Sequence, residues 1–238
     1  MIDTVLFDLD GTLLPLDQDA FVKTYFSCLT EYMAPVCHPP LFMKAMMAGV
    51  EAMLRNNGEV TNETVFWRTF TAVYGQDITP YMPLFDAFYR GKFLEAKSVC
   101  GFNPAAAETV RVLKAKGYRV HLATNPVFPA VATEQRIQWA GMHPEEFFLY
   151  TTYENSHFSK PHPGYYLEIA ETLAVPPERC LMVGNDVDDD MVAETVGMKV
   201  FLLSDCLLNR QNKPTDRYPQ GSFDELMAYL AADRCRGE

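Results

Sequence analysis

The chain has 238 residues, of which 48% are hydrophobic, and this suits one large domain or a core with a smaller insert rather than a disordered chain. Its net charge of −11 argues against the broad basic surface that nucleic acid requires, so no nucleic-acid partner is expected. No stretch approaches the roughly 18 apolar residues of a membrane span, and Asp8 interrupts the apolar start too early for a secretory signal, so we expect a cytoplasmic protein without a membrane partner.

The first expected element is a short buried strand, because Val5, Leu6 and Phe7 form an apolar run directly before Asp8. Residues 17–95 then carry apolar side chains three or four positions apart, separated by turn sequences, which predicts three to five packed helices. From about residue 102, helices and strands alternate, which indicates βαβ units and a mostly parallel sheet.

The alternating half is expected to contain strands within residues 118–125, 146–152, 179–186 and 199–205. Helices are expected within residues 103–117, 129–142, 162–175, 188–197 and 222–231. The simplest architecture is a doubly wound α/β core, residues 1–16 and 96–238, interrupted after its first strand by a helical segment, residues 17–95.

Polar side chains follow the expected strands at the points where these strands end. They are Asp8 and Asp10 after the first strand, Thr124 and Asn125 after the second, Lys160 in the loop beyond the third, and Asp186 and Asp190 after the fourth. Because the carboxyl ends of parallel strands meet at one edge of a sheet, we expect these side chains to converge. Clustered carboxylates with few basic neighbours favour a hard divalent cation, and Mg²⁺ suits such oxygen ligands together with a phosphate group.

Each of these residue types has a chemical role beside a phosphate. An ionised Asp8 can attack phosphorus as a nucleophile, and Asp10 can act first as general acid and then as base. Thr124 can donate a hydrogen bond to a phosphoryl oxygen, and Lys160 can neutralise charge in the transition state. Asn125 suits a phosphate contact and a helix cap equally well. We assign the expected Mg²⁺ to four residues: Asp8, Asp10 (through its backbone carbonyl), Asp186 and Asp190.

Four segments resemble the motifs of the haloacid dehalogenase superfamily, in the same order along the chain. They are "FDLDGTLL", "HLATN", "SKPHP" and "MVGNDVDDDM", and they lie between residues 5 and 191. The resemblance implies a Rossmann-like sheet with strand order 5-4-1-2-3 and an aspartyl-phosphate intermediate. It also implies that residues 17–95 form a helical cap that opens to admit substrate and closes to exclude water.

The fourth segment departs from the usual form of its motif. Asn185 follows Gly184 where an aspartate is usual, and acids stand at positions 186, 188, 189 and 190. Asp186 and Asp190 keep the usual spacing of the acidic pair. If Asn185 takes the first place, Asp189 becomes the second acid, and the sequence leaves both registers open.

The sequence therefore predicts a Mg²⁺-dependent phosphatase that hydrolyses a small phosphorylated metabolite. A phosphomutase on the same scaffold and a non-catalytic protein that binds such a metabolite stay as alternatives. Asp10 argues against a dehalogenase, which usually lacks a second aspartate in the first motif. The sequence identifies neither the substrate nor the oligomeric state.

Overall fold

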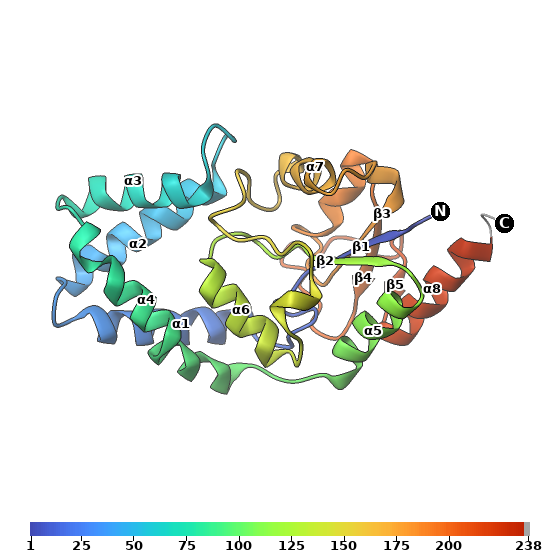
Figure 1. The fold of residues 1–238 in the computed structure, drawn as a ribbon, viewed down its shortest axis with the longest axis horizontal. Helices are drawn as coiled ribbons and strands as arrows, with labels where there is room; N and C mark the ends of the chain where they lie inside the picture. Colours follow the sequence, from blue (N-terminus) through green and yellow to red (C-terminus); the bar gives the residue numbers. More distant parts are fainter. Residues whose placement is uncertain (236–238) are drawn as a thin grey trace.

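The computed structural model describes residues 1–235 and contains one parallel sheet in the order β2-β1-β3-β4-β5, in the right-hand half of Figure 1. The strands are β1 (Thr4–Phe7), β2 (Arg119–Leu122), β3 (Cys180–Gly184), β4 (Lys199–Leu203) and β5 (Gln220–Gly221). Val5 pairs with Val120 on one side and with Leu181 on the other, so β1 lies inside the sheet. The four residues of β1 are all buried, as expected for a parallel strand covered on both faces.

Helices cover both faces of this sheet, so the predicted doubly wound α/β class is confirmed. Leu6 and Met182 pack with α7 (Pro163–Thr172) on one face. Val5 and Leu181 point to the opposite face, which α5 (Pro104–Ala115) and α8 (Phe223–Cys235) cover. This alternation follows from the two-residue period of a strand, which sends successive side chains to opposite faces.

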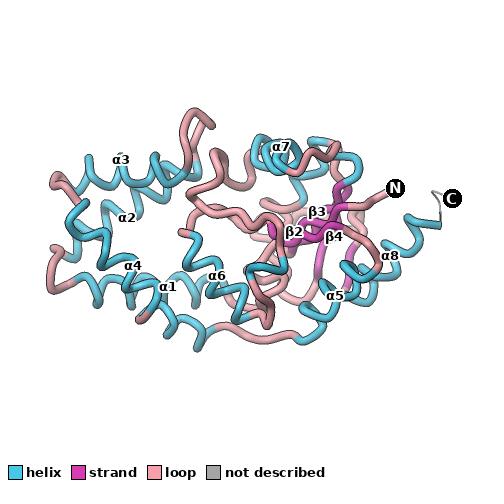
Figure 2. Tube along the Cα trace, viewed as in Figure 1, coloured by secondary structure: helices cyan, strands magenta, loops and turns pink. Residues whose placement is uncertain are grey.

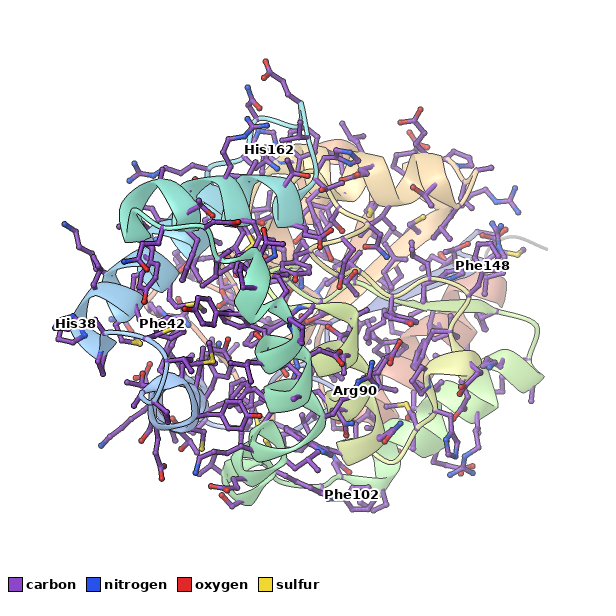
Figure 3. The ribbon with its side chains drawn as sticks, turned by 60° about the vertical axis from the view of Figure 1, so that its left-hand side comes forward. His38, Phe42, Arg90, Phe102, Phe148 and His162 are labelled. Carbon is purple, nitrogen blue, oxygen red and sulfur yellow. The ribbon has the colours of Figure 1, made fainter. Side chains whose placement is uncertain are left out.

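The strand order differs at both edges from the expected 5-4-1-2-3. Residues 146–152 do not form a strand: Tyr150 makes only an isolated parallel bridge with Leu122, and Phe148 is 83% exposed (Figure 3). Phe147 is buried and Phe148 faces solvent, which keeps the in-and-out alternation of a strand, but the single bridge to β2 does not extend into a ladder. At the other edge β5 adds a short strand that the sequence pattern did not indicate, whereas the central order β4-β3-β1-β2 is as expected.

The segment between β1 and α5 is helical, and Figure 2 shows it at the opposite end of the molecule from the strands. Its elements are α1 (Gln18–Met33), α2 (Pro39–Leu54), α3 (Asn62–Tyr74), the 3₁₀ helix η1 (Thr79–Tyr81), α4 (Met82–Arg90) and the 3₁₀ helix η2 (Lys92–Val99). Asp17 caps α1 by accepting a hydrogen bond from the Ala20 N–H, and Thr61 caps α3 in the same way. Since η2 continues to Val99, the helical segment runs past residue 95, and the division into two domains stays a prediction.

The remaining helices connect the strands of the sheet. They are α6 (Ala130–Trp139) and the 3₁₀ helices η3 (Pro144–Glu146), η4 (Pro177–Arg179) and η5 (Met191–Val196). The helix expected within residues 188–197 is therefore a short 3₁₀ helix rather than an α-helix. Within residues 1–235, no helix combines the length and the apolar composition needed to cross a bilayer.

A buried asparagine at the start of α3 joins the helical segment to loops of the sheet-containing half. The side-chain amide of Asn62 donates to the Pro126 carbonyl at 3.2 Å and to Ser159 Oγ at 3.1 Å. Asn62 is fully buried, and its backbone N–H donates to the Ser156 carbonyl at 2.9 Å. Buried amides are costly unless hydrogen-bonded, so these bonds fix α3 against the loop that precedes Lys160.

Candidate active site

The polar residues predicted at the strand ends line one pocket of about 110 Å³ at the carboxyl edge of the sheet. The lining includes Asp8, Asp10, Thr124, Asn125, Lys160, Asn185, Asp186, Asp189 and Asp190. The parallel direction of β1, β2 and β3 explains this convergence, since the residues after each strand must emerge at the same edge. The structure thus brings together all the residues that the sequence singled out.

Asp8 and Lys160 form the centre of this pocket. Lys160 Nζ donates to Asp8 Oδ1 at 2.8 Å and to Asp190 Oδ1 at 2.6 Å, and its side chain is 2% exposed. Burial alone would lower the pKa of Lys160, but the charges of Asp190 and Asp8 raise it well above its usual value. The ammonium group therefore stays charged between two carboxylates. The second oxygen of Asp8 accepts a hydrogen bond from Thr12 Oγ1 at 3.1 Å.

Thr124 and Asn125 complete the wall beside Lys160. Thr124 is buried, and its carbonyl accepts hydrogen bonds from Thr151 Oγ1 at 2.6 Å and from the Tyr165 hydroxyl at 2.8 Å. The side-chain oxygen of Asn125 accepts from the Lys160 backbone N–H at 3.3 Å. These bonds fix the residues after β2 relative to the loop that carries Lys160.

Asp10 faces a buried arginine that the motifs did not point to. Arg136, from α6, is 1% exposed and forms an ion pair with Asp10 Oδ2, and its guanidinium lies 4.4 Å from the centre of the Phe128 ring. Burial raises the pKa of Asp10, and the charge of Arg136 opposes only part of that rise. Asp10 Oδ1 is buried and has no hydrogen-bond partner within residues 1–235. A carboxyl group with a raised pKa and one free oxygen is suited to donating a proton.

The acidic residues after β3 have different surroundings. Both oxygens of Asp190 are engaged, one by Lys160 and the other by the Asp186 backbone N–H at 3.0 Å. Asp186 Oδ1 accepts from the backbone N–H groups of Asp188 and Asp189 at 2.8 and 3.1 Å. Its Oδ2 faces Arg210 Nη1 at 2.7 Å. Burial raises the pKa of Asp189 to about 6, with the neighbouring charge of Asp186 adding to the rise.

Asn185, which replaces the usual first aspartate, is held by the protein on both sides of its amide. Its Oδ1 lies 3.0 Å from Thr12 Oγ1, and its Nδ2 donates to the Cys206 carbonyl at 2.6 Å. Asn185 thus has a structural hydrogen-bonding role, and Asp186 is the first carboxylate after β3 that lines the pocket.

The donor set fits a hard cation in its chemistry, although the described residues contain no ready cluster of three or more acidic, histidine or cysteine ligands. The side chains of all four residues assigned to Mg²⁺ face a protein cation: Asp8 and Asp190 face Lys160, Asp10 faces Arg136, and Asp186 faces Arg210. Arg210 is mostly exposed, so its contact with Asp186 is the one that a divalent ion can most easily replace. Oxygen ligands at the mouth of a phosphate-sized pocket are those that Mg²⁺ prefers.

The sequence analysis did not identify two cations at the site: Arg210, which lines the pocket, and Arg136, which pairs with the lining residue Asp10. Arg136 lies four residues after Ala132 and three before Trp139, both buried, so the helical period places it on the buried face of α6. That position was a usable signal for a paired, functional arginine. Arg210 lies in the loop after β4, and nothing in its sequence surroundings distinguishes it from a surface residue.

The fold and the pocket define a doubly wound α/β protein with its polar residues at the carboxyl edge of a parallel sheet. The chain belongs to the haloacid dehalogenase-like hydrolase family, whose model matches residues 2–197, and the predicted resemblance is thereby confirmed. The comparison with known proteins also finds the pyrophosphatase PpaX of Bacillus cereus, which is 28% identical over 210 residues, covering 88% of this chain and 86% of that protein.

Solved structures with the same fold include proteins with different activities. A 2-haloacid dehalogenase from Pseudomonas syringae superposes with a TM-score of 0.61 at 20% identity, covering 98% of this chain and 99% of that one. The hydrolase YfnB of Bacillus subtilis, determined with bound magnesium, superposes with a TM-score of 0.54 at 19% identity over 96% of this chain and 98% of that one. At these identities the likeness concerns the fold, and the reaction must be argued from the pocket itself.

Proposed function

We propose that this hydrolase is a Mg²⁺-dependent phosphatase that cleaves a small phosphorylated metabolite through an aspartyl-phosphate intermediate. The observation that carries the proposal is the contact of 2.8 Å between Lys160 Nζ and Asp8 Oδ1 in a pocket that Asp10 and Thr124 also line. This contact holds the Asp8 carboxylate in the pocket, where it is placed to attack phosphorus. The pyrophosphatase relative supports the same class of reaction.

In the first half of the reaction, a carboxylate oxygen of Asp8 forms a bond to phosphorus while the bond from phosphorus to the alcohol oxygen breaks. Asp10 gives its proton to the departing alcohol oxygen, which its raised pKa favours. Lys160 neutralises the charge that develops on the phosphoryl group, and the Thr124 hydroxyl and Asn125 amide are placed to donate hydrogen bonds to it.

In the second half, Asp10 takes a proton from water as the water attacks the phosphorus of the acyl phosphate. This step breaks the bond between phosphorus and Asp8 and restores both side chains, so the cycle balances. Asp8, the Asp10 carbonyl and Asp186 would hold Mg²⁺, which when bound supplies positive charge beside the phosphoryl oxygens. Asp190, which is 1% exposed and lies 2.6 Å from Lys160 Nζ, positions Lys160 rather than contacting the ion.

The experiment that tests the proposal is turnover of p-nitrophenyl phosphate by the wild type and by Asp8→Asn, with Mg²⁺ and with a chelator. We expect Asp8→Asn to lose at least about a thousandfold in kcat, or about 4 kcal/mol of transition-state stabilisation. Asp224→Asn, an exposed change on α8, should keep full activity. Normal turnover by Asp8→Asn, or equal rates with chelator and with Mg²⁺, would contradict the mechanism.

The same assay separates the proposed phosphatase from a phosphomutase. A phosphatase releases inorganic phosphate in equal amount to the alcohol, whereas a mutase returns the phosphoryl group to a second hydroxyl. That the enzyme works in the cytoplasm, without nucleic-acid or membrane partners, stays a prediction from the sequence.

A further inference from the structure

A second cavity, of about 260 Å³, lies directly beside the catalytic pocket. The two share Gln18, Asn125, Val127 and Phe128 as lining residues, so they are adjoining parts of one hollow. A phosphate held near Lys160 and Thr124 would therefore have the rest of its molecule directed past Asn125 and Phe128 into the second cavity. The chemistry of this cavity then selects the alcohol part of the substrate.

The walls of the second cavity come mainly from the helical segment and are apolar. Val22 and Phe26 from α1, Val50 from α2 and Trp67 from α3 are among its lining residues. Aromatic packing holds these walls: the Trp67 and Phe85 rings lie 5.0 Å apart. Rings packed edge to face in this way keep their positions, so the void is a shaped space rather than a gap that collapses.

Among the described residues, the lining of this cavity includes no aspartate, glutamate, lysine, arginine or histidine. The hydroxyls of Tyr25 and Tyr89, which also line it, donate and accept between themselves at 2.8 Å. The other polar side-chain groups of the lining are uncharged and few, and they include the Gln18 and Asn125 side chains, which also line the catalytic pocket, and the buried Trp67 indole N–H. A second phosphate or a carboxylate placed here would lose water without gaining a cation, and several sugar hydroxyls would gain too few partners, which is unfavourable. An apolar group, in contrast, gains from leaving water.

The size of the cavity further limits which alcohol group the substrate can carry. An engineered apolar protein cavity of roughly 150 Å³ holds a benzene molecule. A space of about 260 Å³ therefore accepts one aromatic ring with a short linker or a branched alkyl chain. The catalytic pocket, at about 110 Å³, has room for a phosphoryl group.

We propose that the substrate is a phosphate monoester of an apolar alcohol, with an aryl-alkyl or alkyl group that fills this cavity. The proposal rests on the proposed phosphatase function and adds the class of its substrate. It also separates this chain from a pyrophosphatase, because the second half of pyrophosphate is an anion and the cavity presents no cation to it.

The test compares kcat/KM for 2-phenylethyl phosphate and glycerol 1-phosphate. Both release a primary alcohol, so their intrinsic reactivities are close and the ratio reports recognition of the alcohol part. We expect the wild type to prefer 2-phenylethyl phosphate by at least about thirtyfold, the gain from burying roughly 80 Å² of apolar surface. Pyrophosphate should be a poorer substrate than either.

A variant of the cavity wall links this preference to the cavity itself. Val50→Asp places a carboxylate in the wall and should reduce the ratio of the two kcat/KM values at least about tenfold, because the charge must then be desolvated by the phenyl group. Val50→Thr, which keeps the shape, should change the ratio in the same direction by a smaller factor. Val36→Asp, at an exposed valine outside the cavity, should leave the ratio unchanged.

The outcomes distinguish the two levels of the proposal. If the wild type hydrolyses both esters with similar kcat/KM, or if Val50→Asp and Val50→Thr both keep the full preference, the substrate class is wrong while the phosphatase function stands. If the wild type hydrolyses neither ester, nor p-nitrophenyl phosphate, the phosphatase function itself fails, and the substrate class fails with it.

Discussion

Lys160 is expected to contribute strongly to stability because it is buried between two carboxylates. Its Nζ lies 2.8 Å from Asp8 Oδ1 and 2.6 Å from Asp190 Oδ1. At an effective dielectric constant of about 20, each pair attracts by about 6 kcal/mol before the cost of desolvation is subtracted. Replacing the lysine by methionine leaves the carboxylate of Asp190, which is 1% exposed, buried without its cation. We expect Lys160→Met to lower the free energy of unfolding by about 3–5 kcal/mol.

A double-mutant cycle isolates the pair between Lys160 and Asp190 from general effects of the substitution. Asp190→Asn removes the buried charge, so the double variant should be at least about 2 kcal/mol more stable than the sum of the two single losses implies. Urea denaturation at neutral pH, followed by circular dichroism, measures all four proteins. Lys44→Met, at an exposed position of α2, is the control and should change stability little. Additive losses within about 0.5 kcal/mol would refute the assignment of Lys160 as a buried, paired ammonium.

Two further predictions concern acid stability and the space around the lysine. Burial, with the charge of Arg119, lowers the pKa of His121 to about 4, so between about pH 7 and pH 5 the unfolded chain binds more protons than the folded protein. This group alone should lower the free energy of unfolding of the wild type by about 2 kcal/mol over that range. The free energy of unfolding of His121→Leu should therefore fall by about 2 kcal/mol less than that of the wild type. A Cβ at Gly184 would overlap the carboxylate of Asp190, so Gly184→Ala should displace the partner of Lys160 and reduce kcat at least about tenfold.

Controls and contrary results for these two predictions follow from the same geometry. His38→Gln, at an exposed histidine, should keep the wild-type slope of stability against pH in denaturation measured at several pH values. An unchanged slope in His121→Leu would contradict the account of His121, whose two ring nitrogens have no hydrogen-bond partner among residues 1–235. For Gly184→Ala, a kcat equal to that of the wild type in a folded protein would show that the position of Asp190 does not matter.

The central part of the fold followed from local patterns in the sequence. Apolar runs such as Val5 to Phe7, alternating with amphipathic helices, specify a parallel sheet because few other arrangements bury both kinds of element. The sheet edges did not follow from such patterns. Residues 146–152 have the composition and the alternation of a strand, yet they pair with β2 only through the bridge between Tyr150 and Leu122, and the extent of pairing depends on contacts far away in the sequence. The two-residue strand β5 is too short to leave a pattern.

The candidate site was predictable where its residues lie next to strands and not where they lie elsewhere. Asp8, Thr124 and Asp186 were found because a strand end fixes their place in space. Arg136 contacts Asp10 from α6. The helical period of the sequence indicates that Arg136 is buried, but it does not indicate that Asp10 is its partner. Asp186 and Asp190 differ in role because only Asp190 contacts Lys160. The spacing of the two residues in the sequence does not show which of them makes this contact.

The hydrogen bonds of Asn62 have a consequence for how a ligand enters. This one amide binds the Pro126 carbonyl and Ser159 Oγ, and these atoms belong to the two loops that also present Asn125 and Lys160 to the pocket. Any swing of α3 that widens the apolar cavity must therefore rupture those bonds or drag both loops along. Through this single asparagine, the opening of the cavity to a ligand is coupled to the positions of the phosphate-binding groups.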